Sequence, residues 1–158
     1  MLNFNSPTYG KLSLGQMMER ILNYIRSEPE YSYRLVIGTD SQPKNSKRFD
    51  FVTAFVVHRV GAGGIYFWYR LVEERKYHLR ARIYREAMLS LQLAQKLVSF
   101  FPDTELSGYS LEIHVDIGTK GETRAMISEV VGMVRGMGFE VRTKPEAFGA
   151  TSVADRYA

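Results

Sequence analysis

The sequence predicts an α/β protein with a mixed five-stranded sheet and helices on both faces of that sheet. Three observations carry this prediction. An uninterrupted apolar run, Leu35-Val36-Ile37, lies shortly before Asp40 and is typical of a central strand that is buried on both faces. Two long runs rich in β-forming residues follow it and are joined by the glycine-rich turn 61–64. Two further strands are each preceded by a helical pattern, and crossovers of this kind make strands parallel.

The composition is that of an ordinary globular protein, with 158 residues, of which 45% are hydrophobic and 24% are charged. We expect one domain over residues 1–158, in which residues 1–30 form an N-terminal extension and a helix. The chain has no cysteine, which excludes disulfides and thiolate metal sites. No apolar stretch has the length of a membrane span and no signal peptide is recognisable, so we expect a cytoplasmic protein without a membrane partner. The net charge of +4 is compatible with a polyanionic partner.

The first helix is predicted from its capping residues and its apolar face. Residues 1–12 are polar and are expected to be irregular. Ser13 is followed by Gln16 at the spacing of a capping box, and Pro29 follows the predicted end of the helix. The apolar residues recur at helical spacing and form one face: Leu14, Met17, Met18, Ile21, Leu22 and Ile25.

Three strands should follow as an antiparallel meander, at 33–40, 49–60 and 65–74, with a basic loop at 44–48. A long helix begins near residue 78 and should end at Pro102. The fourth strand is expected at 111–116, and the helix after it is stopped by Gly136 and Gly138. The fifth strand is expected at 139–143, and Thr151 or Ser152 is suited to cap a short last helix. The fourth and fifth strands should both be parallel to the first.

Two of these strands end in an aspartate at the same relative position. Asp40 ends the first strand and Asp116 ends the fourth, so both should emerge at the carboxyl edge of the sheet, where open α/β sheets bind ligands. Adjacent strands lie about 4.8 Å apart, and two carboxylates at that spacing repel each other unless a cation such as Mg²⁺ or Mn²⁺ binds them. The alternative is that each aspartate only accepts a hydrogen bond from the backbone amides that follow it in a turn.

Two further acids lie on helices that can reach this edge. Glu86 lies at the margin of the apolar face of the long helix, where the alternative is an ion pair with Arg82 one turn earlier. Asp155 is expected in the first turn of the last helix, where the alternative is a capping box with Ser152. The residues themselves leave both interpretations open.

The order of these elements, with acids on the first strand, the long helix, the fourth strand and the last helix, resembles the ribonuclease H fold. The closer resemblance is to the YkuK-type family of small bacterial ribonuclease H-like proteins. Together with the N-terminal helix it covers nearly the whole chain. Its motifs are Ile37-Gly38-Thr39-Asp40-Ser41-Gln42, Tyr84-Arg85-Glu86-Ala87, His114-Val115-Asp116-Ile117-Gly118 and, as the most specific block, residues 144–155.

This resemblance implies a metal-dependent nuclease that hydrolyses RNA, an RNA–DNA hybrid or structured DNA, including branched DNA. Four acids would be the catalytic residues and would hold two Mg²⁺ or Mn²⁺ ions about 3.5–4 Å apart: Asp40, Glu86, Asp116 and Asp155. Asp40 would bridge both ions. Four polar residues would contact the nucleic acid, with Lys144 neutralising charge in the transition state: Ser41, Gln42, Lys44 and Lys144.

Two other functions use the same fold. One is a catalytically inactive module that binds nucleic acid or protein. The other is a nucleotide-binding fragment like the actin-type ATPases, which use turns such as Asp116-Ile117-Gly118 but need two such domains around a cleft.

Overall fold

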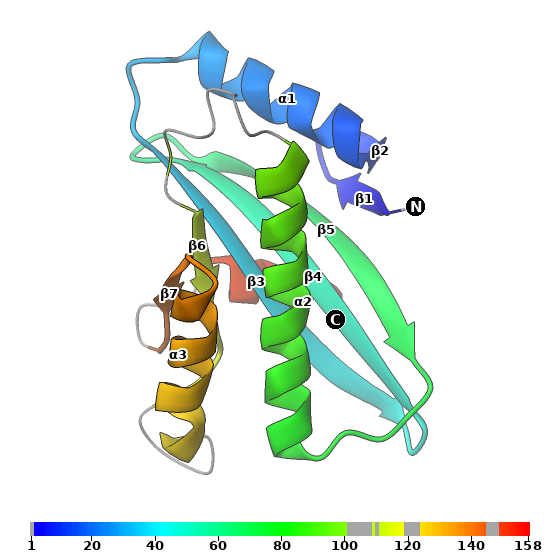
Figure 1. The fold of residues 1–158 in the computed structure, drawn as a ribbon. Coiled ribbons are helices and arrows are strands. Elements are labelled where there is room, and N and C mark those ends of the chain that lie inside the picture. Colours follow the sequence, from blue (N-terminus) through cyan, green and yellow to red (C-terminus); the bar gives the residue numbers. More distant parts are fainter. Residues whose placement is uncertain (1, 101–108, 110, 119–123, 145–148) are drawn as a thin grey trace.

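The sheet is larger than predicted. The computed structural model describes residues 2–100, 109, 111–118, 124–144 and 149–158. Within these residues seven strands form one sheet in the order β2-β1-β5-β4-β3-β6-β7 (Figure 1). The strands are β1 (Asn3–Ser6), β2 (Gly10–Ser13), β3 (Tyr33–Asn45), β4 (Arg48–Arg59), β5 (Gly64–Glu73), β6 (Leu111–His114) and β7 (Glu140–Arg142). The mixed α/β class is confirmed, whereas the count of five strands is wrong.

The two additional strands come from the segment that was expected to be irregular. β1 and β2 form an antiparallel hairpin, and β1 adds to the edge of β5 at Asn5 and Trp68. Each of these short strands contributes one buried apolar residue, Phe4 and Leu12. A single apolar residue gives no period of two, so only the pairing with β5 shows that this segment is a sheet edge.

The predicted strand directions are correct. β3, β4 and β5 form an antiparallel meander, and β6 pairs parallel with both β3 and β7. β3 continues past Asp40 to Asn45, so most of the expected basic loop belongs to the β3–β4 hairpin. The extension is supported by Phe49 and Phe51 of β4, which pack with Leu89.

Four α-helices are described: α1 (Leu14–Ser27), α2 (Leu79–Phe100), α3 (Ile127–Gly136) and α4 (Gly149–Tyr157), with a 3-10 turn at Arg124–Met126. The first three cover one face of the sheet and α4 covers the other (Figure 1). The capping box of Ser13 and Gln16 is present, as predicted. α4 begins at Gly149, so Thr151 and Ser152 lie inside the helix and the expected cap there is wrong. Pro102 lies outside the described residues.

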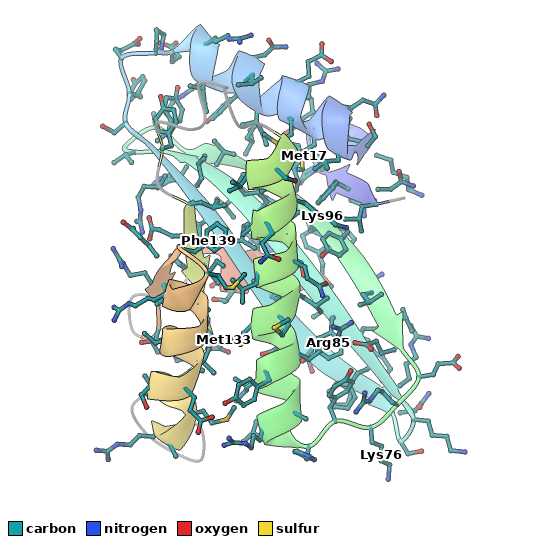
Figure 2. The ribbon with its side chains drawn as sticks, in the orientation of Figure 1. Met17, Lys76, Arg85, Lys96, Met133 and Phe139 are labelled. Atoms are coloured by element: carbon teal, nitrogen blue, oxygen red, sulfur yellow. The ribbon has the colours of Figure 1, made fainter. Side chains whose placement is uncertain are left out.

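The main core lies between the sheet and the three helices on one face. Met17 is fully buried there, between α1 and the end of α2 (Figure 2). The β3 residues Leu35 and Ile37 point into this core. Because side chains alternate along a strand, Gly38 and Asp40 point to the opposite face, toward α4. None of the described helices is long and apolar enough to cross a membrane.

Candidate active site

A glycine allows α4 to lie directly on β3. A Cβ atom added to Gly38 would lie 2.8 Å from the backbone nitrogen of Thr151 and 3.0 Å from the Cβ of Ala150. Asp40 comes two residues after Gly38, about 6.6 Å along a strand. Asp155 comes four residues after Thr151, about 6 Å along a helix. The close approach at Gly38 therefore brings these two carboxyl groups to the same place.

The carboxyl groups of Asp40 and Asp155 form a hydrogen bond. Asp40 is 9% exposed, and its Oδ1 also accepts a hydrogen bond of 2.9 Å from the backbone N–H of Ser41. Burial above all, and then the hydrogen bond with Asp155, raise the pKa of Asp40 to about 7, and the charge of Asp116 adds to this effect. Asp40 therefore holds a proton at a pH where a solvated aspartate has lost it.

Asp116 follows β6, the parallel neighbour of β3, and so lies beside Asp40 at the carboxyl edge of the sheet, as predicted. The β3–β6 ladder pairs Gly38 with His114, so Asp40 and Asp116 are each two residues beyond this pair. β6 itself ends at His114, earlier than expected. Asp116 Oδ1 lies 2.8 Å from Lys144 Nζ. This hydrogen bond to Asp116, and the charges of Asp116 and Asp40, raise the pKa of Lys144 and keep it protonated.

Glu86 of α2 is buried on the opposite side of β3. Its Oε2 accepts a hydrogen bond of 2.6 Å from the hydroxyl of Ser41. Arg82 donates to that hydroxyl at 2.7 Å and to the Ser41 carbonyl at 2.6 Å, and lies 3.7 Å from Glu86. The alternative ion pair with Arg82 is therefore present, mainly through Ser41. Burial raises the pKa of Glu86 to about 8, and the charges of Asp40 and Asp116 contribute.

The described geometry gathers the acids in two groups. Asp40 and Asp155 are in contact with Asp116 nearby on the α4 side, whereas Glu86 lies on the α2 side. Among the described residues, no three His, Asp or Glu side chains converge closely enough to hold a metal ion. The chemistry of the donors nevertheless fits Mg²⁺ or Mn²⁺, because carboxylate oxygens are their preferred ligands and the neighbouring acids raise the pKa values of Asp40 and Glu86. The metal-ligand set remains a prediction.

A family model described as ribonuclease H-like matches residues 16–158. This chain belongs to the ribonuclease H-like family. It is 32% identical over 165 residues to the uncharacterized protein YkuK of Bacillus subtilis (strain 168), and the alignment covers 98% of this chain and 95% of that protein. The YkuK-type membership predicted from the motifs is confirmed.

The chain was also compared with solved structures. A crystal structure of Ciona intestinalis endonuclease V, in complex with a DNA that contains an inosine followed by a ribo-adenosine, is 14% identical. The match has a TM-score of 0.43 and covers 92% of this chain and 66% of that chain. At this TM-score the likeness supports no inference about this chain.

The four residues expected to contact nucleic acid differ in how accessible they are in this ribonuclease H-like protein. Ser41 is fully buried and both its hydroxyl and its carbonyl are bonded. Gln42 is half-buried, whereas Lys44 and Lys144 are exposed. Lys44 Nζ lies 3.2 Å from the carbonyl oxygen of Ala158, and Lys144 lies beside Asp116. A ligand at this surface would therefore meet the two lysines first.

Sequence reasoning missed the contacts that hold the end of α4 in this family member. The ring of Tyr157 stacks on Trp68 of β5 with centroids 4.2 Å apart. Its hydroxyl bonds to that of Tyr66 at 2.7 Å, and its carbonyl accepts a hydrogen bond from Arg70. These contacts fix the turn that carries Asp155. No local pattern relates Trp68 to Tyr157, because the two residues meet only when α4 packs on β5.

The buried carboxyl of Glu86 makes the stability of the metal-free protein depend on pH. Its pKa of about 8 in the folded state exceeds the ordinary value of 4.5 for a glutamate, so the folded state binds more protons and loses stability as the pH rises from about 4.5 to 8. We expect Glu86→Gln, which cannot ionise, to be about 2 kcal/mol more stable relative to wild type at pH 8 than at pH 5. Urea unfolding in the presence of a chelator measures this. A difference that is independent of pH, or that grows toward low pH, would show that Glu86 is already ionised.

Proposed function

We propose that this ribonuclease H-like protein is a metal-dependent nuclease that hydrolyses phosphodiester bonds of RNA, an RNA–DNA hybrid or structured DNA. One observation carries the proposal: the buried carboxyl of Asp40 is hydrogen-bonded to the exposed Asp155, and Asp116 lies two residues beyond the adjacent parallel strand β6. Gathering three acids around a buried Asp40 is unfavourable for an isolated protein, because their charges repel one another and that of Asp40 is partly desolvated. A site that binds divalent cations is a physical reason to keep them there.

Asp40, Asp116 and Asp155 would hold the metal ions, and Glu86 completes the expected set of ligands. When bound, two such ions supply an activated water and stabilise the leaving oxygen of the phosphodiester. The protein's own groups prepare this site. The Ser41 N–H orients the carboxyl of Asp40, and Arg82 with the Ser41 hydroxyl orients that of Glu86. The ammonium group of Lys144 supplies a positive charge on the open side of Asp116, where a phosphate group would approach.

The second candidate is an inactive module that binds nucleic acid or protein. Two observations favour it: no three donors converge on a metal position within the described residues, and Lys144 Nζ already neutralises Asp116. An inactive module would bind its partner equally well with and without a chelator. The nuclease would cleave only with metal.

Adding and removing the metal tests the proposal directly. We expect cleavage of at least one labelled RNA, hybrid or branched-DNA substrate with Mn²⁺ or Mg²⁺, and no cleavage with excess EDTA. Ions that bind only the folded protein at about 100 times their Kd should stabilise it by about 2.7 kcal/mol, and raise its Tm by roughly 5 °C or more. If no substrate is cleaved and the Tm does not move, the nuclease proposal is wrong. A shift in Tm with ATP alone would instead favour a nucleotide-binding protein.

A further inference from the structure

Two basic segments meet at the end of the sheet beyond the acids. One is the tip of the β3–β4 hairpin, residues 44–48, and the other is residues 74–78, which connect β5 to α2 (Figure 1). The β4–β5 ladder pairs Phe49 with Glu73, which places the two segments beside each other. The hairpin extends from β3, the strand that carries Asp40.

An aromatic cluster supports both segments. The ring of Tyr77 packs edge-on against Phe49 and Phe51, with centroid distances of 5.5 and 5.2 Å. Phe49 and Phe51 are themselves buried with Leu89 of α2. The connection from β5 to α2 is therefore fastened to the hairpin, so its charges are held in place relative to the sheet.

Three cations on these segments have no carboxylate within 4.0 Å among the described residues, and we call them the basic end: Lys47, Arg75 and Lys76. All three are exposed. Arg75 lies 4.5 Å over the ring of Tyr77, and Lys76 projects away from the body of the protein (Figure 2). Nearby arginines are different, since Arg48 pairs with Asp50 and Arg85 with Glu73.

We propose that the basic end binds the sugar-phosphate backbone of the nucleic acid on one side of the acid site. This inference rests on the proposed nuclease function. Unpaired cations on a fixed support suit phosphates, which they bind without regard to sequence. The hairpin tip that carries Lys47 begins four residues beyond Asp40, about 13 Å along the strand. Phosphates along one strand of a duplex advance by about 3.4 Å, so the basic end would contact phosphates about four nucleotides from the bond at the acids.

A pair of matched variants tests this surface. The basic-end variant combines Lys47→Gln, Arg75→Gln and Lys76→Gln. The control combines Lys11→Gln, Lys96→Gln and Arg135→Gln, which are also exposed cations without a carboxylate partner among the described residues. Figure 2 shows Lys96 near the opposite end of α2 from Lys76. Each variant removes three positive charges from a chain of net charge +4.

The measurement is fluorescence anisotropy with a labelled duplex that spans both the acids and the basic end, in EDTA and at several salt concentrations. Because each lost phosphate contact reduces the slope of log K against log salt by about 0.9, the basic-end variant should lose a slope of about 2 to 3 and at least about tenfold in affinity. The control should stay within about threefold of wild type. Equal losses in both variants, unchanged affinity in the basic-end variant, or no binding by wild type would each overturn the inference.

The proposed function is tested separately in the same series. Bis(p-nitrophenyl) phosphate is a phosphodiester too small to reach the basic end, and wild-type protein with Mn²⁺ should hydrolyse it. One outcome is that wild type hydrolyses neither this compound nor any oligonucleotide while the basic-end variant alone loses affinity for the duplex. In that case the nuclease proposal fails, and the proposal that the basic end binds nucleic acid stands. If wild type hydrolyses the small diester but both variants bind the duplex like wild type, the proposal that the basic end binds nucleic acid is wrong and the nuclease proposal stands.

Discussion

Asp40→Asn is expected to hydrolyse phosphodiester substrates about 10³-fold more slowly than wild type. Asp40 lies at the centre of the site, since it is hydrogen-bonded to Asp155 and is affected by the charge of Asp116. Removing a carboxylate that holds the metal ions is expected to cost several kcal/mol of transition-state stabilisation, which corresponds to a factor of about 10³ in rate. The rate with saturating Mn²⁺ on the best substrate of the panel measures it.

The same variant is expected to be more stable than wild type when no metal is present. The pKa of Asp40 is about 7 in the folded state against an ordinary value of 3.8 for an aspartate, so ionisation removes stability from the folded state as the pH rises from about 4 to 7. An asparagine cannot ionise. It should therefore stabilise the protein by about 1–2 kcal/mol above pH 7 and by little at pH 4.

Urea unfolding in a chelator at these two pH values measures the gain in stability. Glu19→Gln, which changes an exposed acid on α1, is the control and should have no such effect. An opposite sign for rate and stability separates a functional carboxylate from a structural one. An Asp40→Asn protein that cleaves like wild type, or that is destabilised in the chelator, would contradict the role given to Asp40.

Gly38→Ala is expected to lower both stability and activity. The new Cβ would lie 2.8 Å from the backbone nitrogen of Thr151, closer than real Cβ atoms come to backbone, so α4 has to move off β3. Overpacking of this kind costs about 1–3 kcal/mol, and here the helix that moves also carries Asp155. We expect the free energy of unfolding to fall by about 2 kcal/mol and hydrolysis to fall at least about tenfold as Asp155 parts from Asp40.

Gly132→Ala is the matched control. Gly132 lies within α3, and a Cβ there meets nothing within 4 Å. Alanine in a helix is better than glycine by about 1 kcal/mol, so this variant should be slightly more stable and fully active. If Gly38→Ala were as stable and as active as Gly132→Ala, α4 would not be seated on β3 in the way described.

Much of the fold follows from local patterns. The capping box at Ser13, the period of the three long helices and the long apolar strands are properties of neighbouring residues, so they can be read along the chain. The parallel pairing of β3 with β6 also follows, because a helix between two strands of one sheet gives a parallel crossover. This rule is why Asp40 and Asp116 were expected on adjacent parallel strands, although β6 ends at His114 and Asp116 follows it by two residues.

Other features depend on distant residues and have no local signal. The β1–β2 hairpin exists through its pairing with β5, and β3 extends to Asn45 through its pairing with β4. The alternative of a capping box at Ser152 and Asp155 is excluded because both residues lie inside α4, Gly149–Tyr157. The stacking of Tyr157 on Trp68 joins residues that only the packing of α4 brings together.

The sequence by itself determined which acids this protein has and on which elements they lie, since strand and helix periods and crossovers are local properties. The tertiary structure decided where each carboxyl group points. The pleat of β3 sends Asp40 toward α4 and Ser41 toward α2, so Asp155 meets Asp40 while Glu86 bonds to Ser41. The closeness of α4 to Gly38 then sets the contact between Asp40 and Asp155, because backbone atoms can approach this closely only where no Cβ stands between them.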